Sequence, residues 1–167
     1  MTKELNIGNV PRAIGNYMDL RKLIKDYLKE AKLMQLSTAI DNQPWTCSVW
    51  FAADEDLNIF WFSSTKRRHS KEVMKNPKVS AAIVLPHTPE DDARGLQLEG
   101  NAKLLTEEKD IQKARSVYEG RIFPKKIIDQ FMKSKDRPHK FYKIKPTQFV
   151  LFDVVNFPDE SRQEYNL

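Results

Sequence analysis

Six short segments in which apolar and polar residues alternate place the strongest constraint on how this chain folds. An alternation with a period of two is typical of β-strands that bury one face and expose the other. In residues 45–53, for example, every second residue from Trp45 to Phe51 would face the core. The turn sequence DNQP (41–44) joins this segment to the one before it as a hairpin. The six segments are residues 33–40, 45–53, 57–62, 79–85, 95–105 and 147–157.

Helical periodicity appears at residues 18–32 and again at 125–134. Asp19 can cap the first of these helices, and a further helix is predicted after Thr106, because acidic residues follow it in the first turn. The order of one helix, five strands, two helices and one strand predicts an α+β, mainly β domain. We expect an antiparallel sheet with peripheral helices that closes as a small barrel. Gly100, inside a strand pattern, indicates a bulge or a close approach of two backbones.

Size and composition fit one domain over residues 1–167, with a core at about 18–157 and flexible N- and C-terminal tails. Residues 136–146 are predicted as a loop, and no apolar run reaches the roughly 20 residues of a membrane span. The N-terminus lacks the apolar core of a secretory signal, and Cys47 is the only cysteine. We therefore expect a cytoplasmic protein in which Cys47 is a small buried core residue.

Sequence motifs argue against several classes of enzyme. The three histidines, His69, His87 and His139, lie far apart, and no HExxH or CxxC spacing of a metal site occurs. With only five glycines the chain has neither a dinucleotide-binding fingerprint nor a phosphate-binding loop, and it lacks a nucleophile elbow. A dedicated metal enzyme, a Rossmann-type dehydrogenase and a serine hydrolase are therefore disfavoured.

Positive charge is concentrated in residues 62–77, FSSTKRRHSKEVMKNP, which we call the basic segment. It follows a strand, and Asn76-Pro77 ends the short helix predicted within it. Hydroxyl groups, a guanidinium fork and the start of a helix are the parts that bind a phosphate monoester. The alternative is a solvated basic helix face, because runs of charge usually face water.

The basic segment resembles the corresponding segment of the pyridoxamine-5′-phosphate-oxidase-like, FMN-binding split-barrel proteins. In that family a strand ends in Thr or Ser, a basic pair follows, and the next helix stops at Asn-Pro. The leading helix, the strand pair LMQLSTAI and WTCSVWFA, the strand LQLEGNAKLL and the late strand FYKIKPTQFVLFDV all follow in the family's order. The resemblance covers residues 18–157 and implies a six-stranded antiparallel split β-barrel.

The resemblance also implies a cofactor site. Ser63 matches the strand-end hydroxyl at the flavin phosphate, and Arg68 matches the arginine of the basic pair. His69 stands where lysine is usual, so either the phosphate keeps His69 protonated or the neighbouring Arg and Lys side chains supply the charge. The strand from Thr46 to Trp50 would lie along the isoalloxazine ring. The implied cofactor-binding residues are Thr46, Ser48, Val49, Trp50, Ser63, Ser64, Thr65, Arg67, Arg68, His69 and Gln97.

We expect from this resemblance a homodimeric FMN-dependent oxidoreductase that acts on a small molecule or electron donor, and we name no catalytic side chain. The alternative is a non-catalytic protein of the same fold that binds FMN, haem or a deazaflavin. A third possibility is a basic module that contacts RNA or DNA, which rests only on the net charge of +5 and on aromatic residues expected to be exposed. A charge of this size attracts polyanions only weakly unless it is concentrated at one site.

Overall fold

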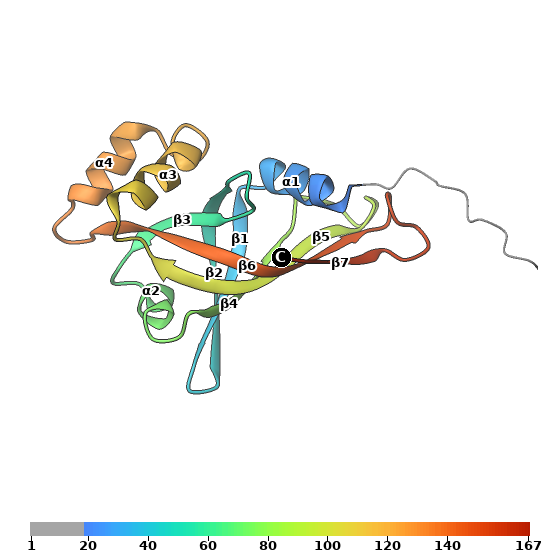
Figure 1. Ribbon diagram of the computed structural model, residues 1–167, viewed down its shortest axis with the longest axis horizontal. Coiled ribbons are helices and arrows are strands. Elements are labelled where there is room, and N and C mark those ends of the chain that lie inside the picture. The colour runs from blue at the N-terminus through green and yellow to red at the C-terminus, as the bar shows by residue number, and fades with distance from the viewer. Residues whose placement is uncertain (1–18) are drawn as a thin grey trace, which may run out of the picture.

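The structure is a computed structural model that describes residues 19–167 (Figure 1). The predicted N-terminal tail lies outside the described residues. The strands are β1 (Leu33–Ile40), β2 (Gln43–Ala53), β3 (Ile59–Ser64), β4 (Lys78–Ile83), β5 (Arg94–Leu104), β6 (His139–Asp153) and β7 (Arg162–Asn166). The helices are α1 (Leu20–Glu30), α2 (Arg68–Val73), α3 (Glu108–Tyr118) and α4 (Lys125–Lys133).

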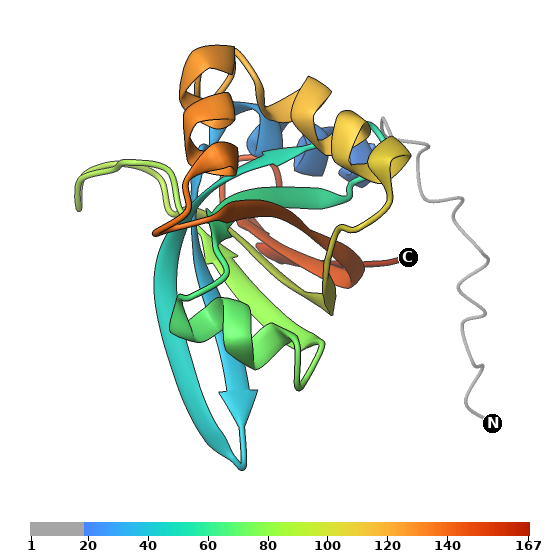
Figure 2. The same cartoon turned by 90° about the vertical axis from the view of Figure 1, so that its left-hand side faces the viewer.

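The sheet closes on itself, as the predicted barrel requires. Its strand order is β3-β2-β1-β4-β5-β6-β7, and β3 also pairs with β6, so that six antiparallel strands form a ring (Figures 1 and 2). Strand β6 pairs with β3 through residues 139–144 and with β7 through residues 148–152. The predicted α+β, six-stranded split barrel is therefore confirmed, and β7 adds a strand that the sequence did not predict.

The barrel interior holds the main apolar core. The rings of Trp61 on β3 and Tyr142 on β6 stack there with centroids 4.9 Å apart. Helix α1 adds its buried Ile24, Tyr27 and Leu28 to the same cluster, as its predicted apolar face requires. Burial of these large side chains is the dominant stabilising contribution to the barrel.

A second apolar cluster lies outside the barrel, where α3 and α4 cover β3 and β6 (Figure 2). Phe60 and Phe62 point outward from β3 into this cluster, while Trp61 between them points inward. Tyr118 of α3 and Ile128 of α4 are fully buried against them. Strand β3 is therefore covered on both faces, which explains why all of its residues are buried.

The predicted loop at residues 136–146 is wrong, because β6 begins at His139 and continues to Asp153. Pro146, the last residue of that segment, lies at a β-bulge, where the register against β5 shifts between Glu99 and Gly100. A proline is tolerated at such a position because no ladder hydrogen bond is lost there. The close approach predicted at Gly100 is confirmed, since a Cβ atom on it would lie 2.5 Å from the carbonyl oxygen of Lys145.

The β1–β2 hairpin extends beyond the barrel. Asp41 and Asn42 both have positive φ, at 51° and 61°, as a two-residue type I′ turn requires. β4 pairs with β1 only at residues 35–37, and β3 pairs with β2 only at residues 51–53. The hairpin tip, residues 38–46, therefore has no other strand partner in the described chain and projects beside α2 (Figures 1 and 2).

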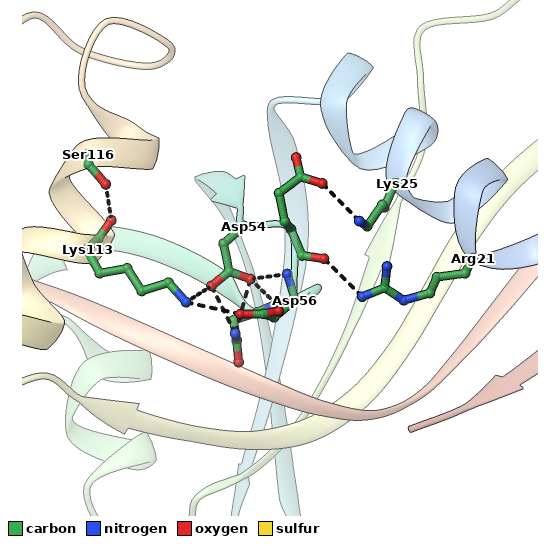
Figure 3. A network of polar contacts seen from close by, with 8 residues as sticks. Arg21, Lys25, Asp54, Asp56, Lys113 and Ser116 are labelled. Atoms are coloured by element: carbon green, nitrogen blue, oxygen red, sulfur yellow. Dashed lines mark hydrogen bonds and ion pairs between the residues drawn. The ribbon is translucent and has the colours of Figure 1, made fainter.

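A polar network joins the β2–β3 turn to α1 and α3 (Figure 3). The Asp54 carboxylate accepts hydrogen bonds from the backbone N–H groups of Asp56 and Asn58, and the ammonium of Lys113 lies 2.7 Å from it. On the other side, Lys25 pairs with Glu55 at 2.8 Å. The network ties two helices to one turn. Within residues 19–167, no helix has the length and apolar character needed to cross a membrane.

Candidate functional site

The candidate site lies where the barrel splits. The pair Phe51–Trp61 is the last between β2 and β3; beyond it β2 extends toward the hairpin tip, whereas β3 remains paired with β6 alone. Helix α2 follows β3 and packs back against the hairpin tip, where Asn76 just beyond it donates a hydrogen bond to the carbonyl of Ala39 at 2.9 Å. The basic segment is thereby placed beside residues 38–47 of the hairpin.

His69 bridges the two strands at the split. Its Nε2 atom lies 2.9 Å from the hydroxyl oxygen of Ser63 at the end of β3, and its Nδ1 atom lies 3.2 Å from the sulfur of Cys47 on β2. His69 and Ser63 are only 7% and 9% exposed. Burial and the nearby charge of Arg67 lower the pKa of His69, although Glu72 opposes them. At neutral pH the imidazole is therefore uncharged and holds β2 and β3 together.

Arg68 is held in place from two sides. Its Nε atom donates a hydrogen bond to Glu72 at 2.7 Å, and its guanidinium carbon lies 4.3 Å from the centre of the Trp45 ring. Glu72 is buried and also accepts a hydrogen bond from the hydroxyl of Thr38 at 2.5 Å. The bonds from Thr38 and Arg68 lower the pKa of Glu72, so the carboxylate stays ionised. Within residues 19–167 the terminal guanidinium nitrogens of Arg68 make no hydrogen bond.

A pocket of about 370 Å³ lies between α2 and the hairpin tip, and we call it the basic pocket. Arg68 and three lysines contribute positive charge to its lining, while Glu72 is the single acid. Both carboxylate oxygens of Glu72 already accept hydrogen bonds, from Arg68 and Thr38. The pocket therefore carries a net positive charge and offers unoccupied donors. Its lining residues are Ile40, Lys66, Arg68, Lys71, Glu72 and Lys75.

The edge of β2 opposite β1 is open beside the split. The backbone N–H of Phe51 points to β1, where it donates to Lys32. Because successive backbone groups of a strand point to opposite edges, those of Thr46, Ser48 and Trp50 point away from β1. The carbonyl of Trp50 accepts a hydrogen bond from Tyr118, whereas β3 pairs with no residue before Phe51. Thr46 and Ser48 thus present backbone donors and acceptors.

The structure brings some of the predicted site residues together and separates others. Ser63, Arg67, Arg68 and His69 gather around the start of α2, but Ser63 and His69 bond to each other. Ser64 is buried on the opposite face of β3, where its hydroxyl accepts a hydrogen bond from the backbone of Lys66. The half-buried Thr65 follows it in the turn and donates its backbone N–H to Pro138.

The predicted residues on the central strands fall on two faces. Val49 points into the barrel and is buried, whereas Thr46, Ser48 and Trp50 project from the outer face of β2. Gln97 lies on the outer face of β5, paired with Ala82 and Val150, and does not line the basic pocket of its own chain.

Sequence reasoning missed three participants in the site. Cys47 was predicted as an ordinary core residue, but it is half-buried and contacts His69. Glu72 and Thr38, which orient Arg68, were not singled out. The spacing of four residues between Arg68 and Glu72 is a signal that could have revealed their pairing on one helix face.

Comparison with known families agrees with this architecture. Residues 20–152 match the pyridoxamine 5′-phosphate oxidase family over most of the described chain. The chain belongs to that family. Among curated proteins, none has a sequence that matches it.

Solved structures share the fold of this family member at low sequence identity. General Stress Protein 26 from Bacillus anthracis has a TM-score of 0.65 at 14% identity, over 90% of this chain and 100% of its own. The heme storage protein HutZ from Vibrio cholerae has a TM-score of 0.63 at 21% identity, over 77% and 91%. An FAD-binding protein from Mesorhizobium loti has a TM-score of 0.58 at 20% identity, over 77% and 88%. Such likenesses define the fold, on which different ligands are bound.

The residues around α2 fit a phosphate group on one side of the helix. On the inner side, Ser63 and His69 form a hydrogen bond with each other and are buried from water. On the outer side, Arg68 offers terminal guanidinium nitrogens, and the ammonium groups of Lys66, Lys71 and Lys75 line the same pocket. An anion therefore fits the basic pocket better than the position between Ser63 and His69.

The buried, neutral His69 makes stability depend on pH. Its pKa is lower in the folded chain than the ordinary value of about 6.5, so the unfolded chain takes up a proton first as the pH falls. Its contribution is complete above pH 7 and is lost below about pH 6.5, with a slope of up to about 1.4 kcal/mol per pH unit. We expect chemical denaturation of the wild type to show this loss between pH 7.5 and 5.5.

The matched variants are His69→Gln, in which this loss should disappear, and His87→Gln on an exposed loop, in which it should persist. The carboxylates with lowered pKa values, such as Glu72, lose their contribution only at more acidic pH. An unchanged slope in His69→Gln would contradict the assignment of a neutral, bridging imidazole.

Proposed function

We propose that the protein is a flavoprotein that binds FMN and supports oxidoreduction of a small molecule. The observation that carries this proposal is Arg68, whose guanidinium is fixed by Glu72 and Trp45 while its terminal nitrogens remain free at the basic pocket. A side chain that is already oriented loses little conformational freedom when it binds a phosphate. Membership of the pyridoxamine 5′-phosphate oxidase family supports the same ligand class.

Arg68 and Lys66 would hold the flavin phosphate at the pocket, and Arg67 beside them adds positive charge. His69 and Ser63 would act as positioning residues, since they fix the start of α2 relative to β2 and β3. The open backbone groups of Thr46 and Ser48 would bond the polar edge of the ring. Bound FMN supplies the hydride or electron chemistry, so no catalytic side chain is required.

A second copy of the chain would complete the site in this proposal. The outer face of β1, β4 and β5 carries small residues and a hollow of about 380 Å³ that Gln97 lines. Trp50, on the outer face of β2, is 48% exposed. Covering this face with a partner would bury Trp50 and allow Gln97 to contact the flavin of the other subunit.

Arg68→Ala tests the phosphate role directly. We expect it to raise the Kd for FMN about 10- to 100-fold, as expected for losing hydrogen bonds to a charged group. The Kd for riboflavin should change little, because riboflavin lacks the phosphate. Quenching of flavin fluorescence measures both constants. Lys109→Ala, at an exposed position on α3 that does not line the pocket, changes the net charge equally and should leave both constants unaffected.

Equal losses for FMN and riboflavin in Arg68→Ala would contradict the assigned role. If the wild type binds no flavin at all, the flavin proposal itself fails. The absorbance spectrum of the purified protein then distinguishes the remaining ligands, since haem and deazaflavin absorb differently from FMN.

A further inference from the structure

The basic pocket holds more positive charge than a single phosphate group needs. Arg68 and Lys71 lie one turn apart on α2, Lys75 lies in the turn after the helix, and Lys66 lies in the turn before it. Among the described residues, no ion pair involves Lys66, Lys71 or Lys75. Glu72 is the only acid in the lining, and both of its carboxylate oxygens already accept hydrogen bonds. Four cationic groups thus face one cavity against a single carboxylate.

Lys71 on α2 and Lys75 in the turn after it line the same pocket, so their like charges repel each other while the pocket is empty. An anion that lies between them removes this repulsion and gains hydrogen bonds from both ammonium groups. The volume of about 370 Å³ is also that of a pocket for a small ligand, which exceeds the space needed by one phosphate. Ile40 forms an apolar part of the wall, which limits how far water solvates the bound anion.

We propose that the basic pocket binds two adjacent anionic groups of the pyrophosphate type. Arg68 holds the first group, and Lys71 and Lys75 hold the second. The inference rests on the proposed function in that the first group occupies the site assigned above to the flavin phosphate. The two groups can be the pyrophosphate of a flavin dinucleotide, or the flavin phosphate and the terminal phosphate of a nucleotide that reacts with the bound flavin, and both place two adjacent anionic groups in the pocket.

Calorimetric titration with inorganic phosphate and with pyrophosphate tests the inference. We expect the wild type to bind pyrophosphate at least about tenfold more tightly, since the second group adds charge-assisted hydrogen bonds. In the double variant Lys71→Gln/Lys75→Gln this preference should fall to less than about threefold, with phosphate binding nearly unchanged. Lys133→Gln/Lys135→Gln removes the same charge from an exposed surface and should keep the preference.

The two sources of the pyrophosphate are separated by two further titrations. A preference for FAD over FMN that disappears in Lys71→Gln/Lys75→Gln assigns the second group to the cofactor. Binding of ADP to the FMN-loaded protein, lost in the same variant, assigns it to a second nucleotide. Equal affinity for phosphate and pyrophosphate, or a preference that the double variant retains, would overturn the inference.

The outcomes also separate this inference from the proposed function. FMN binding that depends on Arg68, without any preference for pyrophosphate, leaves the flavin assignment intact and rejects the second anionic group. A preference for pyrophosphate that depends on Lys71 and Lys75, in a protein that binds no flavin, supports the second anionic group and rejects the flavin assignment.

Discussion

Gly100→Ala is expected to destabilise the protein by about 3 kcal/mol, the upper part of the range for overpacking a tight contact. The added Cβ would lie 2.5 Å from the carbonyl oxygen of Lys145 and 2.7 Å from Cα of Pro146. Both are backbone atoms of β6, so the methyl group cannot be accommodated by a change of side-chain rotamer. The ladder between β5 and β6 must therefore separate locally at the bulge.

Gly95→Ala is the matched control on the same strand, because nothing lies within 4 Å of a Cβ atom at that position. Thermal unfolding should show a fall in Tm of about 6–12 °C for Gly100→Ala, as about 3 kcal/mol predicts for a chain of this size. Gly95→Ala should leave Tm nearly unchanged. Similar Tm values for the two variants would contradict this prediction, because they would show that the backbone of β6 can move at the bulge at little cost in free energy.

Asp54→Ala is expected to cost about 2–4 kcal/mol, because the variant leaves buried hydrogen-bond donors without an acceptor. The two backbone N–H groups of Asp56 and Asn58 both point at this carboxylate, and so does the side-chain amide of Asn58 (Figure 3). Burial opposes the ionisation of Asp54, but hydrogen bonds from Lys113 and Asn58 outweigh it and lower its pKa. Leu57 within the same turn has a positive φ of 65°, which is unfavourable for a leucine, so the turn relies on these bonds.

The control for Asp54 is its neighbour Asp56. Its side chain is 74% exposed and contacts the same lysine at 3.2 Å, and exposed ion pairs of this kind contribute at most about 1 kcal/mol. Asp56→Ala should therefore change the free energy of unfolding little in urea denaturation. Equal effects of the two substitutions would show that Lys113, rather than the turn geometry, provides the stabilisation.

Much of the fold could be predicted from residue patterns, because local periodicity reports which face of an element is buried. Strand β1 matches the predicted residues 33–40, and α1 begins directly after the predicted cap Asp19, which accepts a hydrogen bond from Lys22. The first half of β6 was missed because Pro146 is normally excluded from a strand, and only the bulge opposite Gly100 makes it acceptable. β7 was missed because its residues are mostly polar.

The candidate site was less predictable, since it depends on how α2 turns back onto the hairpin. No local pattern relates His69 to Cys47, and their contact exists only because β2 and β3 separate at the split. The resemblance drew attention to Arg68, whose terminal nitrogens are free at the basic pocket, but it assigned the same kind of role to His69, which is buried and bonded to Ser63. The histidine at position 69, where the family usually has lysine, was the sequence signal that this position differs. Because His69 is buried, it joins β2 to β3 and does not face the basic pocket.

The ring of strands also sets the order in which the chain is expected to fold. The β1–β2 hairpin joins neighbouring residues through a two-residue turn, so it can form within microseconds. The pairing of β3 with β6 joins residues 59–64 to residues 139–144, and the entropy of closing so long a loop must be met before their contacts form. Ring closure is therefore expected to be the late, rate-limiting step, and until it occurs both strands expose unpaired edges that can associate with other chains.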